Sequence, residues 1–212
     1  MALKALRIGA GAGYAGDRIP PAVALAEKGQ LDYLVFECLA ERTIALAQLE
    51  KIQNPMRGFD PLLSARMKAV LPACMAHGTR IITNMGAANP LQAGKEVLAV
   101  AKALGLHQLK VAVVLGDDVL AILQTQYLSE PLMDSTHTVS DIQALLVSAN
   151  AYLGAEALLP ALQSDAHVII SGRVADPALF LAPLMHHFQW RADDWPLLGK
   201  GVMVGHLLEC AA

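Results

Sequence analysis

The sequence predicts an α/β fold, namely an open, mostly parallel sheet of about six strands with helices on both faces, of the Rossmann-like kind. Short runs that are almost continuously apolar alternate with longer runs of helical periodicity, at a spacing of roughly 30 residues that is typical of βαβ units. Strands covered on both faces lose the alternation of half-exposed strands, so these apolar runs indicate buried parallel strands.

The expected strands are short and apolar, and they span residues 6–9, 33–36, 80–83, 110–115, 145–148 and 168–170. The expected helices span residues 21–28, 41–53, 61–77, 90–104, 119–126, 155–163 and 177–188. Three of these helices follow an Asp-Pro or Asn-Pro pair, which places a capping side chain before a proline in the first turn.

An eight-stranded barrel typically needs about 250 residues. The chain has 212 residues, so an open sheet is favoured and an incomplete barrel is the alternative. We expect residues 1–188 to form the α/β domain. Residues 189–212 read as a loop, up to residue 200, and an apolar tail that could begin a truncated region.

Composition excludes several classes of protein. Hydrophobic residues make up 55% of the chain, charged residues 17%, and the net charge is −3 without a cluster of Lys or Arg. A nucleic-acid groove or an anionic membrane surface is therefore not expected. No apolar run approaches the roughly 20 residues of a membrane span. The three cysteines are distant from one another, which favours a reducing compartment and predicts a cytoplasmic protein.

Polar and small residues follow each expected strand. The carboxyl ends of parallel strands share one edge of a sheet, where ligands bind, so we expect these residues to line one cleft. The candidates for acid–base catalysis are Glu37, Asp117 and Asp176. The candidates for binding a substrate or cofactor are Gly11, Gly13, Gly16, Arg18, Asn84, Asn89, Asn150 and Arg173. Capping and turn formation are the alternative explanation for each small residue taken alone.

Gly11, Gly13 and Gly16 match the dinucleotide-binding pattern, and Glu37 stands where an acid binding the ribose would be expected. Against this interpretation, Pro20 and Pro21 follow the glycines, whereas the third glycine of the pattern normally packs within a helix. A glycine-rich loop that holds another anionic or carbonyl ligand is the alternative.

No metal is expected. His77, His107, His137 and His167 recur every 30 residues, but most of them lie at the amino-terminal edge of the expected sheet. The sequence also lacks the spacings that are typical of zinc sites. We interpret Cys38 as a buried, inert thiol.

The segments at the strand ends resemble the acyclic terpene utilisation (AtuA-like) family. The matching stretches include RIGAGAGYAGDR, LDYLVFECLAERTIALAQL, IITNMGAANP, SANAYLGAE and ISGRVADPALFLAP, and the likeness covers nearly all of residues 5–210. The resemblance implies a role in the catabolism of citronellol-type terpenes and related branched acids. It marks residues 9–18, 37–41, 84–90, 148–156 and 171–177 as family hallmarks without giving them catalytic roles. It also implies that family members continue beyond HLLEC, where this chain ends at Ala212.

The leading hypothesis is a small-molecule catabolic enzyme that acts on a branched acyl or carboxylate substrate, with an acyl-CoA or a dinucleotide as the possible cofactor. One alternative is an NAD-binding oxidoreductase. Another is a non-catalytic subunit or assembly module. We expect a homo-oligomer with no nucleic-acid or membrane partner. The candidate contact residues are Met133, Trp190, Trp195 and residues 202–208.

Overall fold

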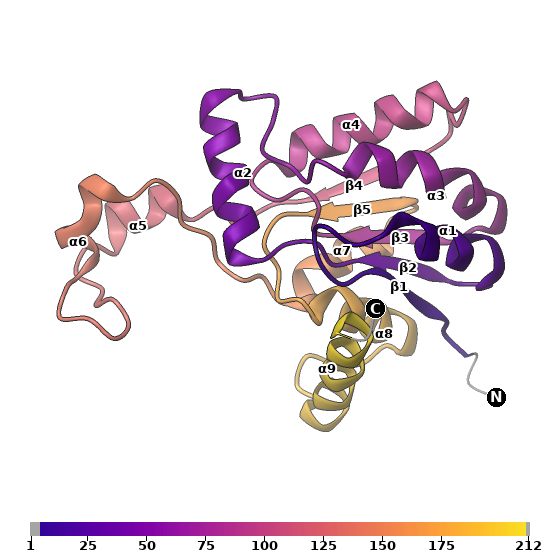
Figure 1. The fold of residues 1–212 in the computed structure, drawn as a ribbon. Helices are drawn as coiled ribbons and strands as arrows, with labels where there is room; N and C mark the ends of the chain where they lie inside the picture. The colour runs from indigo at the N-terminus through magenta and orange to yellow at the C-terminus, as the bar shows by residue number, and fades with distance from the viewer. Residues whose placement is uncertain (1–4, 211–212) are drawn as a thin grey trace.

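The computed structural model describes residues 5–210 and contains a five-stranded sheet in which all strands are parallel (Figure 1). The strand order is β1-β2-β3-β5-β4. The strands are β1 (Ile8–Ala12), β2 (Tyr33–Phe36), β3 (Arg80–Thr83), β4 (Val111–Val114) and β5 (Val168–Ser171). The predicted α/β class and open parallel sheet are therefore confirmed.

The carboxyl ends of the strands are aligned, which matters for the site. Phe36 of β2 pairs with Thr83 of β3, and Val114 of β4 pairs with Ser171 of β5. The residues that follow these positions must therefore emerge at one edge of the sheet.

Two layers of helices bury the apolar strands. The helices α1 (Ile19–Lys28), α3 (Leu63–His77) and α4 (Pro90–Ala103) cover one face. The helices α7 (Leu159–Gln163), α8 (Ala178–Phe188) and α9 (Trp195–Cys210) lie on the other face (Figure 1). This double cover is the physical reason that the strands are apolar throughout. The remaining helix of the body, α2 (Glu41–Gln53), stands at the carboxyl ends of the strands.

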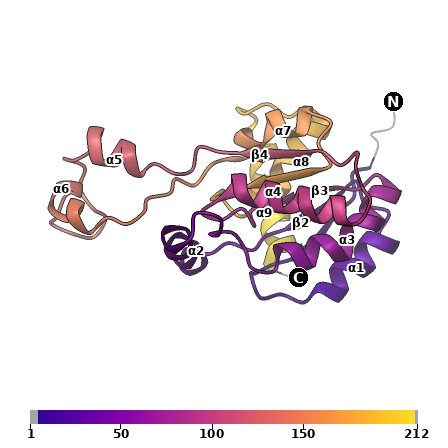
Figure 2. The ribbon, with the colours of Figure 1, turned by 90° about the horizontal axis from the view of Figure 1, so that it is seen from above.

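A long segment between β4 and β5 leaves the body, as both ribbon views show (Figures 1 and 2). We call residues 119–149 the arm. It contains α5 (Leu120–Gln126), α6 (Val139–Ile142) and the 3₁₀ turn η1 (Gln143–Leu145). Backbone hydrogen bonds close its base: the Val119 N–H donates to Ala149 O at 2.9 Å, and the Ala151 N–H donates to Asp117 O at 2.7 Å.

The strand expected over residues 145–148 is wrong, because these residues form the end of η1 and an irregular stretch of the arm. Leu145 and Val147 are exposed there. A short apolar run has the same appearance whether another layer covers it or not, so periodicity alone could not distinguish the two cases.

The expected loop at the carboxyl-terminal end is shorter than predicted, because α9 begins at Trp195. Pro and Gly within WPLLGK suggested a loop, but Pro196 lies in the first turn, where proline is tolerated. Gly201 and Gly205 let α9 lie close to α8: a Cβ atom at Gly205 would come within 3.0 Å of Pro177 O. None of the helices within residues 5–210 has the length and apolar character needed to cross a membrane.

Candidate functional site

The ends of β3 and β5 form the topological switch point of the sheet. After β3 the chain turns to α4 on one face, whereas after β5 it turns to α8 on the other. Ligands of open α/β sheets bind in the crevice that such a divergence leaves. Two glycines let the segments that follow the strands pack closely here, since a Cβ atom at Gly86 would collide with Ser171 O and one at Gly172 would collide with the Asp117 carboxylate.

Glu37 and Asn84 form the centre of the polar side of this region. The Asn84 amide donates to Glu37 Oε1 at 2.7 Å, and the Leu39 N–H donates to the same oxygen at 2.9 Å. Asn84 Oδ1 accepts the Cys38 N–H at 2.8 Å, which fixes the amide. Glu37 is only 5% exposed. Burial raises its pKa to about 7 even though the two hydrogen bonds favour the ionised form, so Glu37 can accept or donate a proton near neutral pH.

Asp117 joins three elements at the neighbouring strand end. Its Oδ2 accepts the Arg173 N–H at 2.8 Å and the Asn150 amide at 3.0 Å. Asn150 in turn accepts from Gln48 of α2 at 3.3 Å. The end of β4, the base of the arm, the end of β5 and α2 are therefore linked through one carboxylate and one amide.

Arg173 holds strand ends together and is not available as a ligand clamp. Its guanidinium donates to Leu39 O, to Val174 O and to Asp176, and all three of its nitrogens are engaged. The group is 2% exposed and lies 4.6 Å from the centre of the Tyr152 ring. The sequence suggested Arg173 because turns do not require a long charged side chain, but this cation stabilises the crevice itself.

Asp176 and Asn89 have different surroundings. Asp176 is partly exposed, and its pKa is raised by burial and by Glu209, while Arg173 lowers it. Asn89 lies away from the Glu37 network. Its amide donates to Pro55 O and Arg57 O at 2.9 and 2.7 Å, so it anchors the connection between α2 and α3.

The glycine-rich loop lies beyond the edge strand β1. Gly11 belongs to β1, where a Cβ atom would collide with the Phe36 ring, and the Gly13 N–H donates to Asp17 at 3.1 Å. Gly16 is exposed and precedes α1, and a Cβ atom there would contact only the Tyr14 ring. A glycine that packs no helix against a strand does not support the dinucleotide interpretation.

Arg18 also lies outside the polar network. Its side chain is exposed, and within residues 5–210 no hydrogen bond to its guanidinium is found. It precedes α1 in an extended conformation. Of the residues proposed from the sequence, the structure therefore brings together Glu37, Asn84, Asp117, Asn150, Arg173 and Asp176, and leaves Arg18, Asn89 and the three glycines apart.

Sequence reasoning missed Arg66, a fully buried cation that supports the glycine-rich loop. Its Nη2 donates to Ala15 O at 3.1 Å and Asp17 O at 2.9 Å, and Nη1 donates to Cys38 Sγ at 3.0 Å. Asp60 lies 3.7 Å away, while Nε has no hydrogen-bond partner. Arg66 lies between Leu63 and Val70 on the buried face of α3, and that spacing was the available signal.

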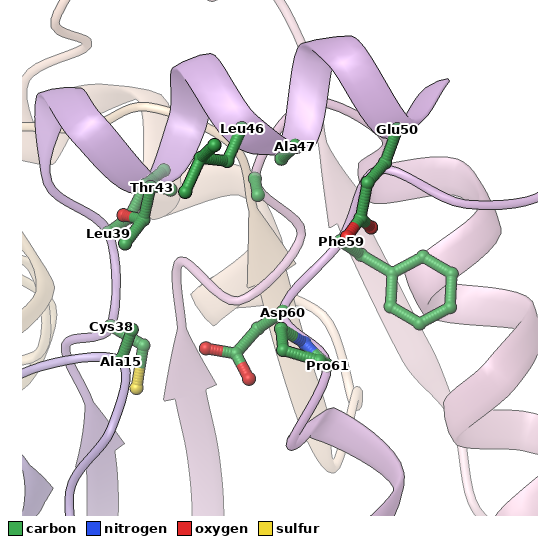
Figure 3. A pocket seen from close by; sticks show the side chains of 11 residues that line it. Ala15, Cys38, Leu39, Thr43, Leu46, Ala47, Glu50, Phe59, Asp60 and Pro61 are labelled. Carbon is green, nitrogen blue, oxygen red and sulfur yellow. The ribbon is translucent and has the colours of Figure 1, made fainter. Parts of the chain in front are cut away.

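A mainly apolar cavity of about 160 Å³ lies between α2 and the strand ends. Figure 3 shows the residues of α2 on one side of it and Cys38, Asp60 and Pro61 on the other. Burial holds the pKa of Cys38 well above its ordinary value, which agrees with an inert thiol. The lining residues are Ala15, Cys38, Leu39, Thr43, Leu46, Ala47, Glu50, Phe59, Asp60, Pro61 and Ala87.

The polar network and the cavity meet at Leu39. Its side chain lines the cavity, its N–H donates to Glu37, and its carbonyl accepts from Arg173. Glu37 follows the residues of β2 that face α8, whereas Cys38 follows those that face α3. Glu37 does not line the cavity itself, and Leu39 links the carboxylate to the cavity wall.

A second group of polar side chains lies at the end of α9. The donor atoms of His206, Glu209 and Cys210 are within 4.8 Å of one another and could hold a metal ion. The sequence analysis overlooked them because the His-x-x-E-C spacing is not a familiar zinc motif and because no helix was expected there.

Comparison with known proteins identifies the family. Residues 6–212 match the family described as acyclic terpene utilisation family protein AtuA. Searches of curated proteins and of solved structures found no match. The match covers nearly the whole chain and includes the strand-end segments that build the crevice and the cavity. The chain therefore belongs to the acyclic terpene utilisation family AtuA.

Proposed function

We propose that this protein is a cytoplasmic enzyme of small-molecule catabolism that binds a branched acyl or carboxylate substrate and moves a proton on it through Glu37. The observation that carries the proposal is a buried carboxylate with a pKa of about 7 that accepts the N–H of Leu39, a residue whose side chain lines an apolar cavity at the strand ends. Family membership supports a substrate related to acyclic terpenes.

The cavity suits an apolar chain. Leu39, Leu46, Ala47 and Phe59 contribute carbon surface to it, and burial of apolar surface stabilises a bound chain by about 25 cal/mol per Å². Its volume of about 160 Å³ is below the roughly 300–1,000 Å³ of most ligand pockets. We infer that it encloses part of the chain and that the remainder lies along the crevice.

Glu37 supplies the proposed chemistry. Oε1 is occupied by the N–H of Leu39 and the amide of Asn84, while no described residue donates to Oε2, which leaves that oxygen for a substrate proton. In the proposed step the C–H bond next to the acyl carbonyl breaks, its electron pair moves into an enolate, and Glu37 takes the proton. After the proton on Glu37 has exchanged with solvent, its transfer back to the same carbon regenerates the acyl compound and the carboxylate.

Ligand binding is tested by thermal unfolding with citronellate and its coenzyme A thioester. At ligand concentrations about 100-fold above Kd, we expect the melting temperature to rise by about 5 °C or more. Ala47→Phe fills the cavity and should abolish this rise, whereas Ala45→Phe on the exposed side of α2 should preserve it. If neither compound shifts the melting temperature of the native protein, the proposal is wrong.

Proton transfer is tested by deuterium exchange. Mass spectrometry should find deuterium next to the thioester carbonyl after incubation of the thioester with protein in D₂O. Glu37→Gln should reduce the exchange at least 100-fold while binding is retained. Glu27→Gln, which changes an exposed carboxylate of α1 that does not line the cavity, should leave the rate unchanged. Equal exchange in the Glu37→Gln and native proteins would exclude the role proposed for Glu37.

Self-association is a second part of the proposal, and the arm favours it. Ile122, Tyr127, Met133 and Leu145 are exposed there, and Met133 is 91% exposed. An ordered segment that buries as little apolar surface as the arm does is poorly stabilised within a single chain. We propose that a second copy of the chain covers the arm, which light scattering after size exclusion would detect as a homo-oligomer.

A further inference from the structure

The end of α9 carries three donor groups of different chemistry on one side of the helix. His206, Glu209 and Cys210 are related by spacings of three and four residues, which place side chains on neighbouring turns of one face. Glu209 is largely covered, while His206 and Cys210 are accessible to solvent. An ion could therefore reach the group without any rearrangement of the body.

The donor atoms already form a triangle of suitable size. His206 Nδ1 lies 3.5 Å from Glu209 Oε2, Cys210 Sγ lies 3.4 Å from Glu209 Oε2, and Cys210 Sγ lies 3.8 Å from His206 Nδ1. Tetrahedral Zn²⁺ with bonds of about 2.0–2.3 Å requires donor separations of about 3.3–3.8 Å. All three separations fall within this range.

We propose that His206, Glu209 and Cys210 form a three-ligand site for Zn²⁺ at the end of α9, with a fourth coordination position open. A sulfur, a nitrogen and a carboxylate oxygen suit Zn²⁺ or Co²⁺, whereas Mg²⁺ and Ca²⁺ prefer oxygen donors alone. Three protein ligands and an open position are typical of zinc sites that bind a water or a substrate.

The three donor groups lie near the carboxylates of the candidate site. Gly205 packs against Pro177, the residue after Asp176, so the last turn of α9 lies beside the start of α8. Asp176 is close enough to be influenced by the charge of Glu209, and Cys210 by the charges of Asp176 and Glu37. A bound divalent cation would add positive charge next to a cluster of carboxylates.

The same contacts without a metal would amount to one partly exposed His–Glu pair and one weak thiol hydrogen bond. The arm offers such a pair as a matched control, because His137 and Asp141 lie 3.9 Å apart at a spacing of four residues with no cysteine in reach among the described residues. If proximity of a histidine and a carboxylate were sufficient, the two pairs should bind a metal equally.

Cobalt titration of the full chain, first stripped with a chelator, tests the proposal without any acyl ligand, so its result is independent of the proposed enzymatic function. We expect near-ultraviolet thiolate-to-cobalt absorption that saturates at one equivalent per chain and is removed by Zn²⁺. Cys210→Ser should eliminate this absorption, and His206→Ala and Glu209→Gln should each weaken Zn²⁺ binding at least tenfold. His137→Ala should change neither.

Alkylation provides a second readout that does not depend on absorption. Cys38 and Cys74 are buried and Cys210 is exposed, so a short reaction with iodoacetamide should label Cys210, and Zn²⁺ should slow the labelling at least tenfold. Circular dichroism shows whether each variant retains its helices. Absence of stoichiometric cobalt binding in the native protein, or equal Zn²⁺ affinity in Cys210→Ser, would overturn the proposal.

Discussion

The sheet and the arm differ in burial: the central strands of the sheet are buried, whereas nearly all residues of the arm are accessible to solvent. All four residues of β2 and of β5 are buried, and helices cover both faces of the sheet. In the arm, Val139 is the one buried residue and α5 buries none of its side chains. The arm also has no Lys or Arg but contains Glu130, Asp134 and Asp141.

This difference indicates that the body is stabilised by its own core, whereas the arm is not. Short helices are marginal in water unless an apolar face is packed, and the arm's helices have no such packing in the single chain. The body, in contrast, has a core on each face of its sheet. We therefore expect substitutions in the body to change the free energy of unfolding, and substitutions in the arm to change association.

The largest effect is expected from Phe36→Ala, which removes a fully buried ring at the end of β2. The lost packing and the cavity left behind should reduce the free energy of unfolding by about 3–5 kcal/mol. Met133→Ala, in the arm, should change it by less than about 0.5 kcal/mol. Urea denaturation measures both. A comparable loss at Met133 would mean that the arm unfolds together with the core.

The junction between the two regions offers a matched pair of aspartates. Asp117 is buried and accepts from Arg173 and Asn150, whereas Asp118 is exposed. Asp117→Ala leaves one buried and one partly buried donor without an acceptor and should cost about 2–4 kcal/mol, while Asp118→Ala should cost less than about 1 kcal/mol. Similar losses in chemical denaturation would show that the linkage through Asp117 is unimportant.

Glu37 should make the stability of the body depend on pH. Its pKa is raised from 4.5 in a solvated side chain to about 7, so the unfolded chain releases the proton first. The contribution of Glu37 to the free energy of unfolding is fully present below about pH 4.5 and is lost as the pH rises through about 7. Between about pH 5 and 8 the free energy of unfolding should fall by about 2 kcal/mol. The charged groups facing it are Asp176 and Arg173, and the Cys210 thiol, whose pKa is raised, also lies near it.

Denaturation at several pH values measures this loss, and Glu37→Gln should flatten that part of the profile. Asp141→Asn in the arm is the control, because Asp141 is exposed there and paired with His137. If the native and Glu37→Gln proteins lose the same stability over this range, another group is responsible.

The smallest effect on the body is expected from removal of the arm. The chain leaves and returns beside the hydrogen bond that the Ala151 N–H donates to Asp117 O, and both of these residues lie outside the replaced segment. Replacing residues 119–149 by a short Gly-Ser linker should change the free energy of unfolding by less than about 1 kcal/mol. Light scattering should report a smaller assembly than for the native chain. An unchanged assembly would place the contact elsewhere, for example on the exposed side of α9.

Much of the fold could be predicted because local signals agreed with the tertiary environment. Apolar runs and prolines in first turns were sufficient for β2, β3 and α4. Residues 145–148 carry the same apolar signal as β5 but lie in the arm, and no sequence pattern records whether a layer covers a strand. The prediction for the tail was wrong for a different reason, since Pro196 and Gly199 suggested a loop but both lie within α9.

The location of the candidate site could be predicted from the expected topology, but the contacts of individual side chains could not. Residues after parallel strands must share an edge, so Glu37, Asn84 and Asp117 could be grouped from the sequence. The sequence could not indicate that Arg173 is occupied by carbonyls or that Arg66 supports the loop. Those roles depend on which long side chain reaches which backbone atom across separate elements.

The position of β4 constrains the order in which the protein can be assembled during synthesis. β4 hydrogen-bonds to β5 alone, and the ribosome completes β5 more than fifty residues later than β4. Until β5 has emerged, β1, β2 and β3 can pair, but residues 111–114 have no strand beside them. The nascent chain must therefore keep this apolar segment unpaired until β5 takes its place between β3 and β4, and this interval is when chaperones would be needed most.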